Sequence, residues 1–164
     1  MKERFLHDIL PLKDMLFRLA LRLTTNREEA EDIVQETFIK LWERRDQWDA
    51  IESMESYAAT LCHNLSLDRL RRMDNRSESI NDHPTLPIAD HAPSPLDHTI
   101  SRDRLHRVQQ IINQLPEKQR ACIQLRDIEG KAYRDIAGML GITESQVKVN
   151  IFRARQALRQ QFQD

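Results

Sequence analysis

The feature that most constrains this chain is its apolar spacing. Hydrophobic residues recur three and four positions apart on both sides of a stretch that contains four prolines. This spacing gathers apolar side chains on one face of a helix, and only 3 glycines among 164 residues disfavour a turn-rich β fold. We therefore predict an all-α fold with two small helical domains, residues 1–73 and 97–164, joined by a flexible, acidic and proline-rich linker over residues 74–96.

Helix start and stop signals divide both domains further. Pro11 suits the first position of one helix. Asn26 opens a capping box for a second helix that runs to about Asp46. Ser53 can cap a third helix, which ends in basic residues up to Arg72. In the second domain we expect four helices, over residues 96–114, 116–127, 133–140 and 144–160.

The formal net charge of −1 hides an asymmetry along the chain. Residues 1–73 carry a net charge of −2, residues 74–103 carry −4 and residues 104–164 carry +5. A basic C-terminal unit favours a polyanionic partner such as DNA. The acidic N-terminal unit favours a different partner for its largest contact.

Several absences narrow the class of protein. No apolar run approaches the ~20 residues that span a bilayer, and the N-terminus lacks the apolar core of a signal peptide. We expect a cytoplasmic protein without membrane insertion, in which Cys62 and Cys122 are reduced, buried thiols. His83, His91 and His98 fit no common metal-site spacing, so we expect neither a metal nor a cofactor.

The run from Tyr133 to Val147 has the pattern of a helix-turn-helix. Gly141 stands where the turn needs a positive φ, which costs glycine little. Thr143 caps the next helix, and Gln146 completes a capping box. The inward stripe of that helix comprises Val147, Ile151, Ala154 and Leu158.

The outward face of this motif carries side chains that can hydrogen-bond to base edges or phosphates. The candidate residues for binding duplex DNA are Arg134, Ser145, Gln146, Lys148, Val149, Arg153 and Arg155. A solvated surface helix would look similar, but the turn glycine and an alanine in register favour DNA binding. Phe152 lies off the apolar stripe, and the sequence does not account for it.

The second predicted helix has a polar face with an apolar residue at its centre. Asp32, Gln35 and Glu36 surround Ile39 on this face. A single exposed isoleucine is common in soluble proteins. An apolar centre with a charged rim is also typical of a protein contact. Spacing alone leaves both interpretations open.

The third predicted helix gathers Tyr57, Asn64, Asp68 and Arg71 on one stripe, with Arg72 beside them. An aromatic ring, an amide and a guanidinium can stack on unpaired bases and hydrogen-bond to them. An ordinary polar helix surface has the same composition. Tyr57 can also cap the small core instead.

Five segments resemble one family, the extracytoplasmic-function sigma factors of bacterial RNA polymerase. Residues 26–42 resemble the polymerase-binding segment of that family, and residues 57–72 are similar to its −10-reading helix. Its −35-reading domain is resembled by Leu115–Arg120, Tyr133–Ala137 and Val147–Arg155. The matching segments occur in the family's order and cover both ends of the chain.

The resemblance implies a non-enzymatic subunit that binds core RNA polymerase and directs promoter-specific initiation. It implies that Asp32, Gln35 and Glu36, with Ile39, meet the β′ clamp helices, and that the last domain rests on the β flap. It implies that Asn64 and the preceding loop meet a flipped base of the −10 strand. An anti-sigma factor is the further partner implied. Tyr57 departs from the family, since many relatives carry tryptophan there, and this leaves the base preference open.

A second class of function also fits a helix-turn-helix. A stand-alone transcriptional regulator with an N-terminal interaction domain would bind duplex DNA without polymerase. A receiver domain would need strands that alternate with helices, and residues 1–73 show no strand pattern. No nucleophile–base pair or metal-ligand spacing favours an enzyme.

Overall fold

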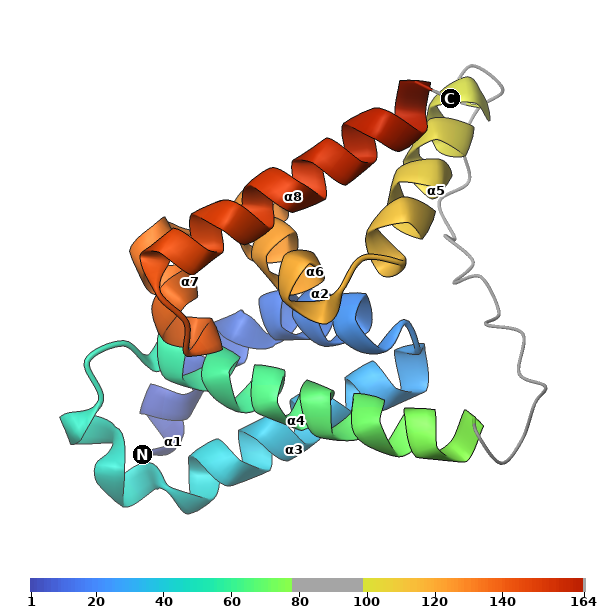
Figure 1. Cartoon of the computed structure of the whole chain (residues 1–164). Helices are drawn as coiled ribbons and strands as arrows, with labels where there is room; N and C mark the ends of the chain where they lie inside the picture. Colours follow the sequence, from blue (N-terminus) through green and yellow to red (C-terminus); the bar gives the residue numbers. More distant parts are fainter. Residues whose placement is uncertain (78–98, 164) are drawn as a thin grey trace.

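The computed structural model describes residues 1–77 and 99–163, and no strand occurs among them, which confirms the all-α prediction. The first half contains α1 (Lys2–Arg4), a π-helical turn η1 (Phe5–Ile9), a 3₁₀ turn η2 (Leu10–Leu12), α2 (Lys13–Thr24), α3 (Arg27–Glu43), a 3₁₀ segment η3 (Arg45–Ala50) and α4 (Met54–Ser77). The second half contains α5 (Thr99–Asn113), α6 (Glu117–Ile123), a π-helical turn η5 (Gln124–Ile128), α7 (Tyr133–Leu140) and α8 (Glu144–Gln163) (Figure 1).

The N-terminal helix differs from the prediction because helical structure begins at Lys2 and not at Pro11. Pro11 lacks a backbone N–H, so a regular α-helix cannot continue through it without losing a hydrogen bond. The chain accommodates the proline with the wide turn η1 followed by the tight turn η2, and regular geometry resumes at Lys13.

The caps of α3 and α4 confirm two start signals. The Asn26 side chain accepts a hydrogen bond of 3.1 Å from the Glu29 backbone N–H, and Ser53 Oγ accepts one of 3.2 Å from the Ser56 backbone N–H. The predicted helix ends are less accurate. Helix α3 ends at Glu43 and not near Asp46, and α4 continues to Ser77, past the predicted domain boundary at residue 73. The rest of the predicted linker, residues 78–96, lies outside the described residues.

Helices α2, α3 and α4 pack around one another in the first half. Their shared core contains Leu16, Leu19, Leu23, Ile33 and Cys62, all fully buried. The core extends to η3, where the buried Trp48 donates a hydrogen bond of 2.9 Å from Nε1 to the Leu41 carbonyl. The segment around Trp48, between α3 and α4, is therefore an ordered 3₁₀ segment that the indole ties to α3.

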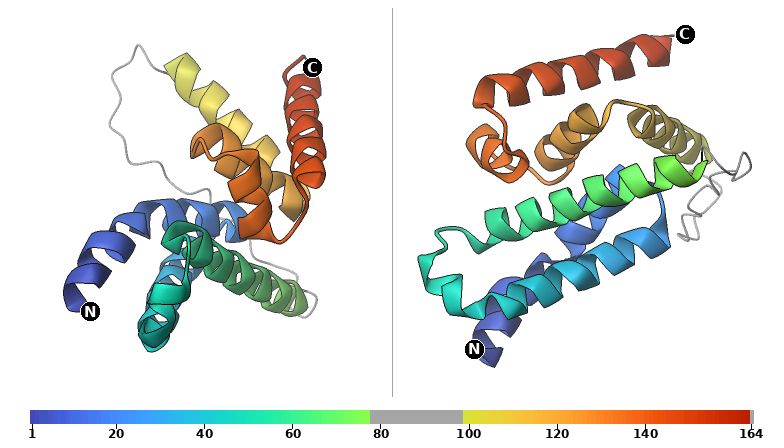
Figure 2. Two further views of the ribbon diagram at one scale, coloured as in Figure 1. Left: turned by 90° about the vertical axis from the view of Figure 1, so that its left-hand side faces the viewer. Right: turned by 60° about the horizontal axis from the view of Figure 1, so that its bottom comes forward.

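The two halves share one hydrophobic core, which the sequence did not predict. Ala121, Cys122, Leu125 and Ile136 belong to the same buried cluster as the residues of α2 and α4. Helix α7 lies against α4, and α6 lies against α2 (Figures 1 and 2). A smaller cluster holds α5, α6 and α8 together and consists of Ile112, Leu115, Ile123 and Ala154.

Polar contacts surround this shared core. Arg22 of α2 donates to the Gln124 side chain at 2.8 Å and to the Asn113 side chain at 3.2 Å. Arg120 of α6 donates to the Arg22 and Leu23 carbonyls at the C-terminal end of α2, where a cation complements the helix dipole. Burial lowers the pKa of both arginines. The halves are therefore joined by partly buried hydrogen bonds as well as by apolar packing.

Candidate nucleic-acid and protein-binding surfaces

Helices α7 and α8 form the predicted helix-turn-helix. Gly141 follows α7 with a φ of 68°, so the turn has the left-handed geometry that glycine adopts without strain. The Thr143 backbone N–H donates to Gln146 Oε1 at 2.9 Å, and the Gln146 backbone N–H donates to Thr143 Oγ1 at 3.1 Å. This reciprocal pair is the predicted capping box. It fixes the first turn of α8, the part that a recognition helix presents to bases.

The buried stripe of α8 also follows the prediction. Val147, Ile151 and Ala154 are buried, and Leu158 is half-buried. On α7 the structure buries Ile136 and Met139, and the half-buried Ala137 and Leu140 pack against the same core. This packing holds α8 with its opposite face in solvent.

The exposed face of α8 brings together most of the predicted DNA-binding residues. Ser145, Lys148, Val149 and Arg153 are exposed, as is Gln146, whose side-chain Oε1 accepts the cap hydrogen bond while its side-chain nitrogen Nε2 takes no part in the cap. A hollow of about 360 Å³ lies on this face. It is lined by Lys118, Ile142, Ser145, Gln146, Val149, Asn150 and Arg153. Lys118 comes from α6, and sequence spacing could not place it here.

Two other cationic residues that were predicted to bind DNA, Arg155 and Arg134, lie outside this exposed hollow on α8. Arg155 donates to both carboxylate oxygens of Asp127, at 2.5 Å and 3.1 Å, and this contact raises the pKa of the guanidinium. Arg155 is thus tied to η5 and not free on the surface. Arg134 is exposed on α7. Phe152, which the sequence left unexplained, is 66% exposed between Val149 and Arg153 on α8.

Helix α3 presents the predicted polar face around Ile39. Its carboxylates Glu29, Asp32 and Glu36, here called the acidic face, all contact one arginine of α4. Ile39 is 56% exposed, as predicted for a residue outside the core. The Arg69 guanidinium lies between three carboxylates of α3: Nη1 contacts Glu29, and Nη2 contacts Asp32 at 2.6 Å and Glu36 at 3.2 Å. Sequence reasoning missed Arg69, because its partners are more than thirty positions away.

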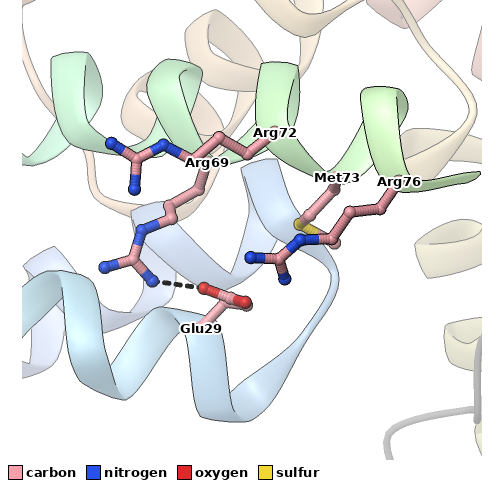
Figure 3. Close-up of a pocket in the computed structure, with 5 residues that line it drawn as sticks. All are labelled: Glu29, Arg69, Arg72, Met73 and Arg76. Carbon is pink, nitrogen blue, oxygen red and sulfur yellow. Dashed lines mark hydrogen bonds and ion pairs between the residues drawn. The ribbon is translucent and has the colours of Figure 1, made fainter.

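Beside this cluster, the last turns of α4 form a cationic hollow of about 250 Å³. It is lined by Glu29, Arg69, Arg72, Met73 and Arg76. Figure 3 shows Arg69 reaching from α4 to Glu29 on α3, with Arg72 and Arg76 on neighbouring turns of the same helix. Arg72, a predicted −10 residue, therefore borders the acidic face of α3.

The predicted −10 stripe on α4 divides into exposed and packed residues. Asn64 and Asp68 are exposed, and Arg71 forms an ion pair of 3.4 Å with Asp68. The Tyr57 ring packs against the core, and its hydroxyl lies 2.7 Å from Arg44 Nη1. Tyr57 thus fits the alternative in which it caps the core, while its polar end remains near the surface.

Histidine, cysteine, aspartate and glutamate side chains occur throughout residues 1–77 and 99–163. No group of three or more metal-ligating side chains occurs within these ranges. Cys62 and Cys122 are buried free thiols, and burial raises the pKa of Cys62 to about 12 and that of Cys122 to about 11. Among the same residues, no helix is long and apolar enough to cross a membrane.

Two family models match successive parts of the chain. The profile of Sigma-70 region 2 matches residues 9–76, and that of Sigma-70 region 4 matches residues 105–158. The chain is 35% identical to the ECF RNA polymerase sigma factor SigE of Mycolicibacterium smegmatis over 149 residues, which are 89% of this chain and 56% of SigE. It is 32% identical to SigW of Bacillus subtilis over 161 residues, which are 93% of this chain and 85% of SigW.

Solved structures share the fold at lower identity. The sigma factor RpoE, solved with the anti-sigma factor NepR from Bartonella quintana, superposes with a TM-score of 0.76 at 22% identity, over 99% of this chain and 98% of RpoE. CnrH, solved with the cytosolic domain of CnrY, gives a TM-score of 0.71 at 20% identity, over 99% of this chain and 90% of CnrH.

Proposed function

The chain belongs to the extracytoplasmic-function sigma factors of RNA polymerase, and from that premise we propose how its surfaces divide the work of promoter recognition. In this proposal the chain binds core RNA polymerase in the cytoplasm and directs transcription to promoters that carry its −10 and −35 elements. It contributes binding surfaces and no catalytic step. Residues 1–73 form the polymerase-binding and −10-reading unit, and residues 97–164 form the −35-reading unit.

The observation that carries the proposal is the exposed face of α8 beside its rigid cap. Arg153 and Lys148 project from a helix whose first turn is fixed by the capping box of Thr143 and Gln146. Arginine can make paired hydrogen bonds to guanine in the major groove, and lysine holds phosphates as a point charge. The exposed Val149 and Phe152 add apolar atoms that fit a thymine methyl group.

The −10 strand is assigned to the exposed part of α4. Asn64 can hydrogen-bond to an unpaired base, and Arg71 and Arg72 can contact the base or its phosphate. All three are exposed, whereas Tyr57 is half-buried. We therefore assign the larger role in base capture to Asn64, with Tyr57 forming one wall of the contact.

The protein partner is assigned to α3. Asp32, Gln35 and Glu36 form a polar rim around the exposed Ile39, which suits a protein contact with cationic groups opposite the rim. We propose the β′ clamp helices for this face and the β flap for the last domain. An anti-sigma factor is proposed as a further partner, as in the complex of RpoE with NepR.

Size-exclusion chromatography with purified core polymerase tests this assignment, followed by run-off transcription from genomic DNA and mapping of transcript starts. We expect co-elution with core polymerase and a discrete set of starts that share two sequence elements. A chain that fails to co-elute, yet binds specific duplex DNA tightly by itself, would instead be a stand-alone regulator.

A further inference from the structure

The acidic face of α3 is organised by a residue of another helix. Glu29, Asp32 and Glu36 occupy positions three and four residues apart, so their carboxylates share one face of α3. Three carboxylates in such a row repel one another and would turn their side chains apart. Arg69 of α4 contacts all three at once.

The geometry of Arg69 suits an organising role. Its two terminal nitrogens bind different carboxylates: Nη1 contacts Glu29, while Nη2 contacts Asp32 at 2.6 Å and Glu36 at 3.2 Å. Only a planar guanidinium can hold separate partners in such a fixed fork. The hydrogen bond to Asp32 is the main cause that raises the pKa of Arg69, so the cation is permanent.

The exposure of the four side chains separates the anchored part from the part that a partner can reach. The side chains of Arg69 and Glu29 are 18% and 22% exposed, whereas those of Asp32 and Glu36 are 56% and 40% exposed. Arg69 uses Oδ2 of Asp32 and Oε2 of Glu36. The other oxygen of each carboxylate has no hydrogen bond to the described residues and remains an acceptor for a partner cation.

We propose that Arg69 is a positioning residue for polymerase binding, which holds the Asp32 and Glu36 carboxylates in the orientation that the partner recognises. This inference rests on the proposed docking face and deepens it. The cluster keeps a net charge of −2, so a cationic partner is still attracted. Binding to two carboxylates that are already oriented costs less conformational entropy than binding that must first order their side chains.

The alternative is that the face acts through its negative charge alone. The two possibilities predict opposite signs for Arg69→Gln. If charge dominates, removing the cation makes the face more negative, and core polymerase binds more tightly. If orientation dominates, core polymerase binds about tenfold more weakly, because two long side chains must be ordered at the interface.

The salt dependence gives a second readout that simple damage to the fold would not produce. Removing Arg69 leaves three uncompensated carboxylates, so the affinity for a cationic partner should fall more steeply with added salt. We therefore expect Arg69→Gln to combine weaker binding with a steeper salt slope. A locally unfolded face would bind more weakly with a shallower slope.

Arg27→Gln is the matched control. Arg27 lies on α3 and, like Arg69, pairs with an acidic residue of α3, Glu31 at 3.4 Å, but both side chains are more than half exposed and neither contacts the cluster. Each substitution removes one positive charge that pairs with a carboxylate of α3, so an effect of net charge alone would appear in both variants. Arg69→Lys keeps the charge but replaces the fork with one nitrogen, and we expect intermediate affinity.

The experiment titrates a fluorescently labelled full-length chain with core polymerase at a series of salt concentrations, with helicity checked by circular dichroism. Weaker binding by Arg69→Gln than by Arg27→Gln, with partial recovery in Arg69→Lys, supports the inference. Unchanged or tighter binding by Arg69→Gln overturns it. If Arg69→Gln loses helicity, Arg69→Lys decides instead: affinity equal to that of the unsubstituted chain overturns the inference, and reduced affinity supports it.

Ile39→Glu separates failure of the inference from failure of the docking assignment. If Ile39→Glu abolishes binding while Arg69→Gln leaves it unchanged, the face is the docking face and Arg69 does not position it. If neither substitution changes the affinity, polymerase binds elsewhere, and both the docking assignment and the inference are wrong.

Discussion

Arg18 of α2 and Glu129, at the end of η5, form a bidentate ion pair between the two halves of the chain. Arg18 Nη2 and Nε lie 2.6 Å and 2.9 Å from the two carboxylate oxygens of Glu129. The Glu129 side chain is only 5% exposed, and its hydrogen bonds raise the pKa of Arg18. Lys131, two residues later, pairs with Glu55 of α4 at 2.7 Å. These contacts lie beside the shared core and favour the packed arrangement of the halves.

Glu129→Gln should loosen this junction. The substitution keeps the shape of the side chain but removes its charge, and the amide nitrogen that replaces one oxygen cannot accept a hydrogen bond from Arg18. We expect the free energy of unfolding to fall by about 1–2 kcal/mol, less than for a fully buried pair, because Arg18 is half exposed and can be rehydrated. Urea unfolding followed by circular dichroism measures the change.

Glu31→Gln is the control for that measurement. Glu31 forms an exposed pair with Arg27 on α3 and takes no part in the pair of Arg18 with Glu129. Such pairs contribute at most about 0.5 kcal/mol. Equal effects of Glu129→Gln and Glu31→Gln would show that the bidentate pair does not stabilise the packed halves.

Ile39→Glu should abolish binding to core polymerase and leave the fold intact. Ile39 is 56% exposed and outside the core, so a charge there costs little folding stability. At the centre of an interface the same charge should cost more than about 2 kcal/mol, the magnitude of a hot spot. Co-elution measures binding, and thermal unfolding checks the fold. Retained co-elution by both Ile39→Glu and Glu36→Lys would place the partner face elsewhere.

Asn64→Ala should weaken promoter melting more than closed-complex binding. Asn64 is exposed on α4, so its truncation removes a base contact without opening a cavity. The loss for a captured base is about 1–3 kcal/mol. Permanganate footprinting of promoter thymines measures melting. Tyr57→Ala should affect both melting and stability, because the ring also packs against the core. Normal melting by both variants on duplex and premelted templates would mean that this stripe is misassigned.

Lys148→Ala and Arg153→Ala should weaken −35 recognition in different ways. If Lys148 holds a phosphate, all promoters lose affinity similarly and the salt slope falls by about 1. If Arg153 reads a base, its loss costs about 1–3 kcal/mol and relaxes preference at one position. Binding of holoenzyme to a −35 library at several salt concentrations separates the two effects. Arg155 is less suitable for this test, because Asp127 already holds it.

The Cys62 thiol should make stability depend on pH at alkaline values. Burial raises the pKa of Cys62 from 9.0 to about 12, so the folded state keeps a proton that the unfolded chain releases. The stabilisation is fully present below pH 9 and is lost as pH rises toward 12, by about 1.4 kcal/mol per pH unit. Urea unfolding of the natural chain and of Cys62→Ala across this window measures it. Parallel pH profiles would contradict the prediction.

Local sequence signals determined the helical fold and the recognition motif. The Asn26 cap, the left-handed Gly141 and the capping box of Thr143 and Gln146 each act within about four residues, so spacing along the chain predicts them. The exposure of Ile39 and of most of the α8 face followed from helical periodicity for the same reason. The resemblance to the family rested on short segments in a fixed order along the chain, from residues 26–42 to residues 147–155.

The tertiary structure alone decided which surfaces are shared or occupied. The pair of Arg18 with Glu129 and the contact of Arg69 with the α3 carboxylates join residues 33 to 111 positions apart, and the shared core joins helices of both halves. No local pattern encodes such contacts, because each depends on how complete helices pack. For the same reason the sequence predicts Arg155 as a DNA-binding residue and does not reveal that Asp127 of η5 pairs with it. Periodicity determines which face of a helix is polar, and only packing determines which partner that face receives.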